Sequence, residues 1–560
     1  MDTIKKTCAA SCSGSARFSR RSGMQTHKTT LLMLGCLFNI PVQAAGWIST
    51  GTQAHPTQQL APNARDAGEI AGGEVVHIAV SLAMRNQALL NALTDNILAG
   101  QGQPISDAQF MSQYAPTAAQ AQQVVSHLRQ SGFRNIAVSP NNLLVTAEGS
   151  AATVYGAFQT RLHRYDVGGR QAVANIQNAQ VPASLAGIVL AVHGLQSVHQ
   201  FHAAFHAQSV SKAASGIVAH KPTDFASIYN AASLPAAKNG VAGIIAEGNL
   251  SQTVADLNSY AKSAGFAAPS VAIVNAGTPS PDTSGIMEWN LDSQTMLAAS
   301  GGALKQLQFY VAPSMNNADI AAAINAAVAA NSAKVINVSL GECELGAKAS
   351  GMTASVDQML QAAVAHGQTF SVSSGDSGSY ECGGSSAYQS YPAVSPYVIA
   401  VGGTTLTTGG TTTYGSEKTW SGSGGGPSAT EAAPSWQTAS GVLTTAKTKR
   451  GVPDIAFDAD PGSGELVLVS GSTYQVGGTS LAAPLFSGFW IRIQSANGNK
   501  LTSPANAIYK YFKANPSLYR DVASGSNGAF KATAGWDYTT GWGSLNIANL
   551  NAFIAKTAGF

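Results

Sequence analysis

From about residue 220 onward, the chain alternates between short apolar runs and longer helical patterns. A short apolar run bounded by turn residues is typical of a buried strand, and a period near 3.6 residues is typical of a helix. Strands separated by helices favour right-handed crossovers and a parallel sheet with helices on both faces. We therefore predict a doubly wound α/β domain. Its predicted strands are 241–246, 271–276, 307–311, 335–339, 370–374 and 398–401, and its predicted helices are 253–264, 285–299, 317–331 and 356–366.

A smaller unit with a different pattern precedes this region. Residues 75–82 read as a strand, and 118–131 form an amphipathic helical pattern. Two further strands surround a Ser-Pro-Asn-Asn turn at 139–142, and a second helix is predicted over 150–158. These elements predict a small α+β domain. The residues that follow it, 202–216, are mostly small and polar, which is typical of a cleavable linker.

The N-terminal residues have the pattern of an export signal. Basic residues up to Lys28 are followed by an apolar run at 31–38, which is too short to span a bilayer, and by small residues with a cleavage site after about Ala44. Met24 is an alternative start. A lipoprotein site at Cys36 and a buried core segment are the other interpretations. We expect secretion into the medium, with retention in the periplasm as the alternative.

Composition narrows the classes of protein. Hydrophobic residues make up 45% of the 560-residue chain and charged residues 11%, which excludes a disordered protein. A net charge of +3 does not favour a nucleic-acid binder. Five cysteines exclude a disulfide-dense scaffold, and only Cys343 and Cys382 remain once the signal region is removed. We expect these two to pair, because exported cysteines meet an oxidising compartment.

The candidate nucleophile is Ser480, within the sequence Gly-Gly-Thr-Ser-Leu-Ala-Ala-Pro at 477–484. A predicted helix begins beside it at Leu481, and the free N–H groups of a helix N-terminus stabilise nearby negative charge. An ordinary helix cap is the alternative for this serine. The whole string, however, resembles the nucleophile motif of subtilisin-like serine peptidases.

The positions of the histidines argue against the usual histidine base. Nine of the 11 histidines precede residue 216, and only His220 and His366 follow it. Neither has the sequence context of a subtilisin base, and His366 ends a predicted helix, where the helix dipole favours the charged form. We therefore do not expect a Ser-His-Asp triad. A subtilisin mechanism with His366 as a cryptic base is kept as an alternative.

Two carboxylates are placed to replace the histidine. Glu288 and Asp292 are four residues apart in the predicted helix 285–299, so both lie on one face of it. Large apolar residues flank them, which favours a shielded position over a solvated surface pair. Two carboxylates in such a position titrate as a coupled unit, and one of them keeps its proton to higher pH.

Four motifs occur in order along the larger domain: Glu288-x-x-x-Asp292, Ser-Gly-Asp-Ser-Gly at 374–378, Ser-Gly-Gly-Gly-Pro-Ser at 423–428 and Gly-Thr-Ser-x-x-x-Pro at 478–484. Together they resemble the sedolisin family of serine-carboxyl peptidases, and especially its secreted bacterial members. The match extends over about 220–560, and 110–117 resembles the activation domain of that family. The resemblance implies an α/β, subtilisin-like catalytic domain preceded by a small α+β, ferredoxin-like prodomain.

The resemblance also implies a role for each of four residues. Ser480 would attack the peptide carbonyl, Glu288 would take its proton, and Asp292 would hold Glu288 and share that proton. Asp376 would be the oxyanion donor. Because a carboxyl group donates a hydrogen bond only while it is protonated, we expect activity to peak in acid.

A calcium site near the C-terminus is implied in the same way. Carboxylates within Gly-rich loops provide the oxygen ligands that Ca²⁺ prefers. The expected ion is structural and is held by the side chains of Asp521 and Asp537 and by the carbonyls of Val522, Thr533 and Gly535. Thr533 stands where relatives often have glycine, so this carbonyl ligand departs from the family pattern.

On this resemblance the chain divides into a signal-peptide region at 1–45, an activation prodomain at 46–205, a cleavable linker at 206–219 and a catalytic domain at 220–560. We expect a secreted, acid-active endopeptidase made as an autoprocessed, monomeric zymogen. Its partners would be protein and peptide substrates and its own prodomain, with no nucleic acid or membrane. A binding protein on an inactive peptidase fold is the alternative, and the presence of all four catalytic positions argues against it.

Overall fold

The computed structural model describes residues 46–208, 217–443, 447–557 and 560. The predicted signal region therefore lies outside the described residues, as do residues 209–216 of the predicted linker. No helix within the described ranges is long and apolar enough to cross a membrane.

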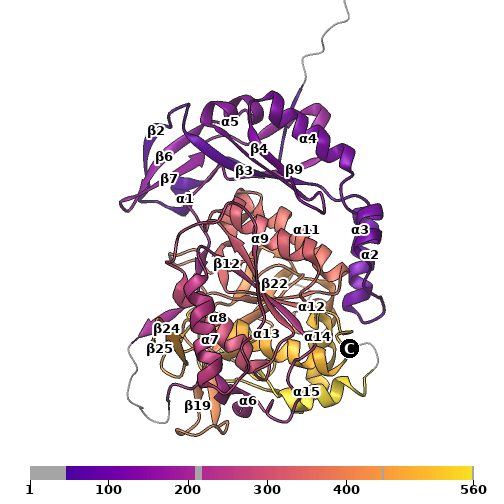
Figure 1. Cartoon of the computed structure of the whole chain (residues 1–560), viewed down its shortest axis with the longest axis vertical. Helices are drawn as coiled ribbons and strands as arrows, with labels where there is room; N and C mark the ends of the chain where they lie inside the picture. The colour runs from indigo at the N-terminus through magenta and orange to yellow at the C-terminus, as the bar shows by residue number, and fades with distance from the viewer. Residues whose placement is uncertain (1–45, 209–216, 444–446, 558–559) are drawn as a thin grey trace, which may run out of the picture. The chain divides into compact units, whose positions relative to one another are not determined.

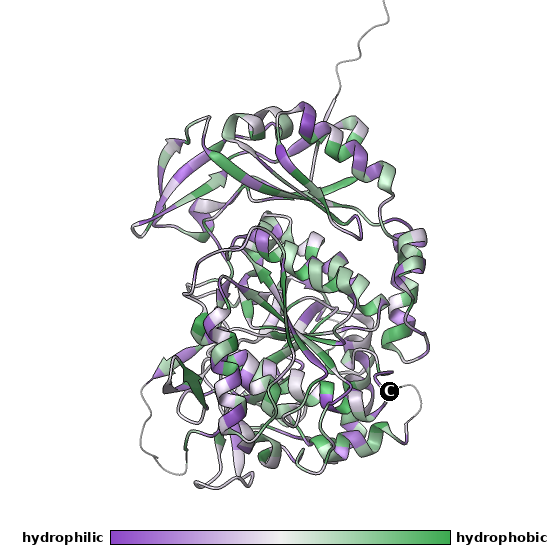
Figure 2. Ribbon diagram, in the orientation of Figure 1, coloured by the Kyte–Doolittle hydropathy of each residue, from purple (hydrophilic) through white to green (hydrophobic). Residues whose placement is uncertain are grey.

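A sheet of eight strands within these residues organises the larger domain (Figure 1), in the order β13-β14-β12-β15-β17-β19-β20 with β23 beside β19. Neighbouring strands are parallel, except that β20 runs antiparallel to β19. The central strands are buried and largely hydrophobic (Figure 2), as expected when helices cover both faces. The predicted doubly wound fold is confirmed. The strands are β12 (Val241–Glu247), β13 (Val271–Asn275), β14 (Gln306–Ala312), β15 (Val335–Val338), β17 (Thr369–Ser373), β19 (Ile399–Thr407), β20 (Ser416–Thr419) and β23 (Ile455–Asp458).

Two pairs of helices cover the sheet (Figure 1). Helices α9 and α11 pack on each other and on one face, and α8 and α13 do so on the other. Helix α7 packs beside α8. All the predicted helices are present, with ends that differ by a few residues. Their bounds are α7 (Ser251–Ser263), α8 (Ile286–Ala299), α9 (Asn317–Ala330), α11 (Met352–Ala365) and α13 (Thr479–Ala496).

The N-terminal domain folds around an antiparallel sheet in the order β4-β5-β3-β9. Its chain order is strand, helix, strand, strand, helix, strand, which is the ferredoxin-like arrangement predicted from the sequence. A smaller sheet, β2-β6-β7, adjoins it. The elements are β2 (Arg65–Glu69), β3 (Val75–Leu82), α4 (Ala118–Gln130), β4 (Arg134–Val138), β5 (Leu144–Ser150), α5 (Ala151–Phe158), β6 (Leu162–Val167), β7 (Arg170–Asn175) and β9 (Val189–His193).

This domain packs on the α9 and α11 face of the catalytic sheet. Strand β3 contacts α9, and β9 contacts α11, as does α2 (Gln87–Leu98). Polar groups are satisfied across the interface: Gln358 Nε2 donates to the carbonyl of Leu82 at 2.7 Å, and His193 Nε2 lies 2.9 Å from Ser355 Oγ. The two domains therefore share a buried boundary, and 46–560 form one compact unit.

The segment that joins the domains forms two short strands on the catalytic domain. Strand β10 (His202–Ala203) pairs antiparallel with β16 (Leu340–Cys343). Strand β11 (His206–Gln208) pairs antiparallel with β25 (Ser472–Gly477). The sequence predicted only a small, polar linker here, and the pairing partners lie far away along the chain.

The C-terminal part follows α13. Strands β26 (Tyr519–Arg520) and β27 (Ser544–Leu545) pair antiparallel, and the loops between them contain the predicted calcium ligands. The elements that flank these loops are α14 (Ala505–Tyr511) and α15 (Ile547–Ile554).

Candidate active site

Glu288 and Asp292 lie in the first half of α8, the helix that packs against α13 beneath the sheet. Both side chains are fully buried, with 0% exposure. The Glu288 oxygens have no hydrogen-bond partner among the described residues. Asp292 Oδ1 accepts a hydrogen bond of 2.6 Å from the Ser339 hydroxyl. The predicted carboxylate pair is thus in a shielded place, one turn apart on one helix.

Burial dominates the protonation of this pair. Burial, and then the charge of Asp292, raises the pKa of Glu288 well above its ordinary value, although the hydroxyl of Ser480 opposes the shift. Burial raises the pKa of Asp292 to about 8, and the hydrogen bond from Ser339 opposes that shift. Two buried carboxyls this close do not both ionise near neutral pH, so the pair holds at least one proton.

Ser480 is the second residue of α13, where the chain leaves β25. Its hydroxyl affects the pKa of Glu288 and lies 3.4 Å from the carbonyl oxygen of Ser339. Gly478 precedes it with φ of 117°, a conformation that favours glycine. A side chain at Gly478 would collide with Asp376 Oδ2, so this loop can lie close to Asp376 only with glycine at that position.

Asp376 follows β17, at the carboxyl end of the parallel sheet where sites on such folds lie. Its Oδ1 accepts two hydrogen bonds of 2.7 Å, from the backbone N–H and the hydroxyl of Thr479. Its Oδ2 has no hydrogen bond among the described residues and faces Gly478. Burial raises the pKa of Asp376 to about 7, against the lowering effect of Thr479. The proton that Asp376 carries in acid therefore belongs on Oδ2.

The remaining Gly-rich motif, at 423–428, packs against the loop that carries Asp376. The backbone N–H of Gly424 donates to the carbonyl of Gly375 at 2.8 Å. A side chain at Gly424 would collide with the Ser374 carbonyl, which explains the glycine in this motif. The motif at 423–428 therefore supports the loop that positions Asp376.

The two histidines of the catalytic domain lie elsewhere. His366 Nδ1 is 3.4 Å from the carbonyl of Ile105 and 3.6 Å from Asp107 Oδ1, so it faces the prodomain. The expectation that the helix end favours its charged form is wrong, because burial lowers the pKa of His366. The His220 ring lies by Thr408 and Phe225. Neither contacts Ser480 within the described part of the chain.

Sequence reasoning missed Ser339 and Asn337, and Ser339 joins Asp292 to Ser480. Asn337 Nδ2 donates to Ser339 Oγ at 2.8 Å, and Ser339 in turn donates to Asp292. The signal was present: both are polar residues at the carboxyl end of an otherwise apolar predicted strand. Polar side chains in a strand that is buried on both faces need partners, and here the chain of hydrogen bonds ends on Asp292.

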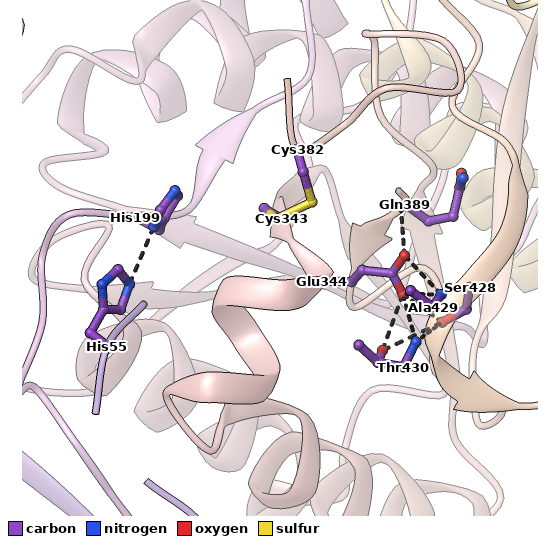
Figure 3. Close-up of a disulfide and its surroundings, with 9 residues drawn as sticks. All are labelled: His55, His199, Cys343, Glu344, Cys382, Gln389, Ser428, Ala429 and Thr430. Atoms are coloured by element: carbon purple, nitrogen blue, oxygen red, sulfur yellow. Dashed lines mark hydrogen bonds between the residues drawn. A yellow bond between two sulfur atoms is a disulfide. The ribbon is translucent and has the colours of Figure 1, made fainter. Parts of the chain in front are cut away.

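The predicted disulfide is present between Cys343 and Cys382 (Figure 3). Next to it, Glu344 begins helix α10 (Glu344–Ala349) and accepts hydrogen bonds from the backbone N–H of Gln389 and of Ala429. The disulfide and this carboxylate fasten the loop after Asp376 and the 423–428 motif to the end of β16.

The predicted calcium ligands surround one loop. The Gly535 N–H donates to Asp521 Oδ2 and the Thr533 N–H donates to Asp537 Oδ2, each at 2.8 Å. Among the described residues, no hydrogen bond reaches the carbonyl oxygens of Val522, Thr533 or Gly535. The described residues contain no group of three acidic, His or Cys side chains that would hold a metal. Two carboxylates and three unpartnered carbonyls are oxygen groups of the kind that a hard cation binds.

A family model described as "Pro-kumamolisin, activation domain" matches residues 62–198, and one described as "Subtilase family" matches 239–543. Sedolisin of Pseudomonas sp. (strain 101) is 44% identical over 550 residues, which cover 92% of this chain and 93% of that protein. The chain belongs to the sedolisin family.

Two further comparisons agree. Xanthomonalisin of Xanthomonas sp. (strain T-22) is 42% identical over 85% of this chain, which corresponds to 65% of that protein. The solved structure of Pseudomonas sedolisin, a serine-carboxyl proteinase complexed with two molecules of pseudo-iodotyrostatin, is 45% identical, with a TM-score of 0.58, and covers 61% of this chain and 99% of that one. This sedolisin-family protein is accordingly a serine-carboxyl peptidase with an activation prodomain.

Proposed function

We propose that the protein is a secreted endopeptidase active in acid, in which Ser480, Glu288, Asp292 and Asp376 carry out peptide-bond hydrolysis. The observation that supports this most strongly is the position of Asp376 Oδ2, which lies beside Gly478 of the nucleophile loop and 3.5 Å from His206 Nε2, while Oδ1 is engaged by Thr479. A neutral carboxyl in that position donates a hydrogen bond where negative charge develops.

The reaction uses the four residues in turn. Ser480 Oγ attacks the substrate carbonyl carbon, and its proton passes to Glu288. Asp292 shares the proton of the pair and is oriented by Ser339. The oxyanion is stabilised by the backbone N–H of Ser480 and by protonated Asp376. Glu288 then gives its proton to the leaving amine, and water hydrolyses the acyl-enzyme in the same way.

Calcium belongs to the proposal as a structural ion. Asp521 and Asp537 would hold it together with the carbonyls of Val522, Thr533 and Gly535. When bound, it would fix the loop between β26 and β27, and no catalytic step depends on it.

The test is a pH–activity profile on a denatured protein substrate, with wild type beside Ser480→Ala and Glu288→Gln. Both variants should lose activity at every pH. Wild type should be most active in acid and lose activity as pH rises through about 7. An optimum above neutral pH would contradict the role of Asp376, and full activity in Ser480→Ala would favour a binding protein on an inactive fold.

A further inference from the structure

The joining segment between the domains enters the candidate site in an extended conformation. Strand β10 places His202 opposite Gly341 and Ala203 opposite Leu340. Strand β11 places His206 opposite Gly477, the residue before the Gly-Thr-Ser motif. An extended segment that adds a strand to an enzyme's own strands on both sides of its nucleophile is bound as a peptide substrate is bound.

The carbonyl between these two strands occupies the oxyanion position. The backbone N–H of Ser480 donates a hydrogen bond of 3.0 Å to the carbonyl oxygen of Ala204. A side chain at Gly478 would collide with this oxygen and also with Asp376 Oδ2, so the oxygen and the carboxyl share one small space. Both proposed oxyanion donors thus face the carbonyl of a single residue.

Side chains fix the register of the segment. Phe201 is 2% exposed, and its N–H donates to the carbonyl of Met315 at 3.1 Å. The methyl group of Ala204 is buried, with 6% exposure. On the other side, His206 Nε2 lies 3.5 Å from Asp376 Oδ2, and Gln208 Nε2 donates to the Pro461 carbonyl at 2.9 Å. Anchors on both sides prevent a shift by one residue, which would turn each side chain to the opposite face.

We infer that the peptide bond between Ala204 and Phe205 is the first substrate of this enzyme, cleaved within its own chain. This inference rests on the proposed function, and it places the cut one residue before the linker expected at 206–219. Ser480 Oγ bonds to the Ala204 carbonyl carbon while its proton moves to Glu288. The bond from Ala204 to the Phe205 nitrogen then breaks, and that nitrogen takes the proton. Water hydrolyses the ester, which leaves a carboxylate on Ala204 and an amine on Phe205.

The experiment uses the full chain, purified above pH 7 and then moved to acid. Early samples are analysed by intact mass and by N-terminal sequencing. The first new N-terminus should be Phe205, and the complementary fragment should end at Ala204. The rate should not depend on protein concentration, because the substrate is already in place. A first cut at any other bond, including bonds within 206–219, would overturn the inference.

Matched variants separate this inference from the proposed function. Phe205→Pro should abolish the cut after Ala204, because the scissile nitrogen becomes part of a ring, whereas Ala213→Pro in the expected linker should process at the wild-type rate. Melting curves of both variants, measured with Ser480→Ala added, test whether they fold. If Phe205→Pro does not fold, the first new N-terminus of the wild-type chain decides which bond is cut. Self-cleavage at the wild-type rate in Ser480→Ala alone would refute the proposed function. Cleavage that depends on Ser480 but begins elsewhere would refute only the assigned bond.

Discussion

Asp376 is bound to Thr479 through one carboxyl oxygen only. The backbone N–H and the hydroxyl of Thr479 both donate to Oδ1, and Oδ2 lies beside Gly478. This asymmetry fixes which oxygen carries the proton. It makes the carboxyl a donor below its pKa of about 7 and a repulsive charge above it.

Replacing Asp376 with asparagine should therefore change the pH dependence more than the rate. Thr479 would hold the amide oxygen, and the NH₂ group would face the substrate at every pH. We expect Asp376→Asn to retain activity above pH 7, where wild type loses it. Below pH 7, where the wild-type carboxyl is a donor, Asp376→Ala should lose about 10²–10³-fold in kcat. The measurement is kcat against pH for the three proteins, and identical alkaline limbs for wild type and Asp376→Asn would contradict the prediction.

Ser339 should set the acid limb of the profile. Its hydrogen bond to Asp292 lowers the pKa of that carboxyl, so Ser339→Ala should raise it further. The pair would then first ionise at higher pH, and the low-pH limb of kcat/KM should move upward. The control is Ser487→Ala, which removes a hydroxyl bonded to the other side of Asn337. The prediction is wrong if both variants shift the limb equally or if neither does.

Two prodomain histidines should promote activation in acid. His199 Nδ1 lies 3.3 Å from His55 Nε2 beside α10 (Figure 3). Burial, and then the charge of His199, lowers the pKa of His55 to about 3; burial, with Arg170 nearby, lowers the pKa of His199. A released prodomain would bind these protons near pH 6.5, so acid weakens the assembled form progressively from pH 6.5 to about 3.

The double variant His55→Gln, His199→Gln should need a lower pH for half-maximal processing. His163→Gln serves as the control, since His163 pairs with Asp66 within the prodomain. The measurement is the fraction of chain processed at a fixed time across a pH series. Equal midpoints for wild type and the double variant would show that other groups drive release.

Buried carboxyls should make the folded chain less stable as pH rises. Burial raises the pKa of Glu342 to about 8, so its stability contribution is present below about pH 4 and is lost as pH rises through 8. In a Ser480→Ala background, Glu342→Gln should gain unfolding free energy relative to its parent as pH rises from 4 to 8, by at most about 1.4 kcal/mol per pH unit, and its melting temperature should rise accordingly. Glu148→Gln, at a partly exposed carboxylate bonded to Asn135, should show no such trend. A constant difference for Glu342→Gln would contradict this.

Removal of calcium should lower the melting temperature of the Ser480→Ala chain. An ion present at about 100 times its Kd contributes about 2.7 kcal/mol to folding, and a chelator removes this contribution. Asp521→Asn should melt at the lower temperature with or without the chelator, whereas Asp282→Asn should respond as its parent does. The measurement is a thermal scan with and without the chelator. A melting temperature that chelation leaves unchanged would count against the site.

The sequence by itself determined much of this protein. Alternation of apolar runs and helical patterns indicated the doubly wound sheet, because strands buried on both faces must be apolar throughout. The spacing of Glu288 and Asp292 placed them on one helix face, and the motifs around Ser480 and Asp376 identified the family. These are local sequence patterns or short motifs, which can be interpreted without knowing which distant residues they contact.

Only the tertiary structure decided what surrounds those residues. The hydrogen bonds from Asn337 through Ser339 to Asp292, those from Thr479 to one oxygen of Asp376, and that from Ser480 to Ala204 all join segments far apart in the chain. The linker is an example: its small, polar composition predicted only a cleavable connection, yet its first residues pair as strands with β16 and β25. The sequence does not show which backbone groups will form hydrogen bonds with each other, because every residue except proline has the same backbone donor and acceptor.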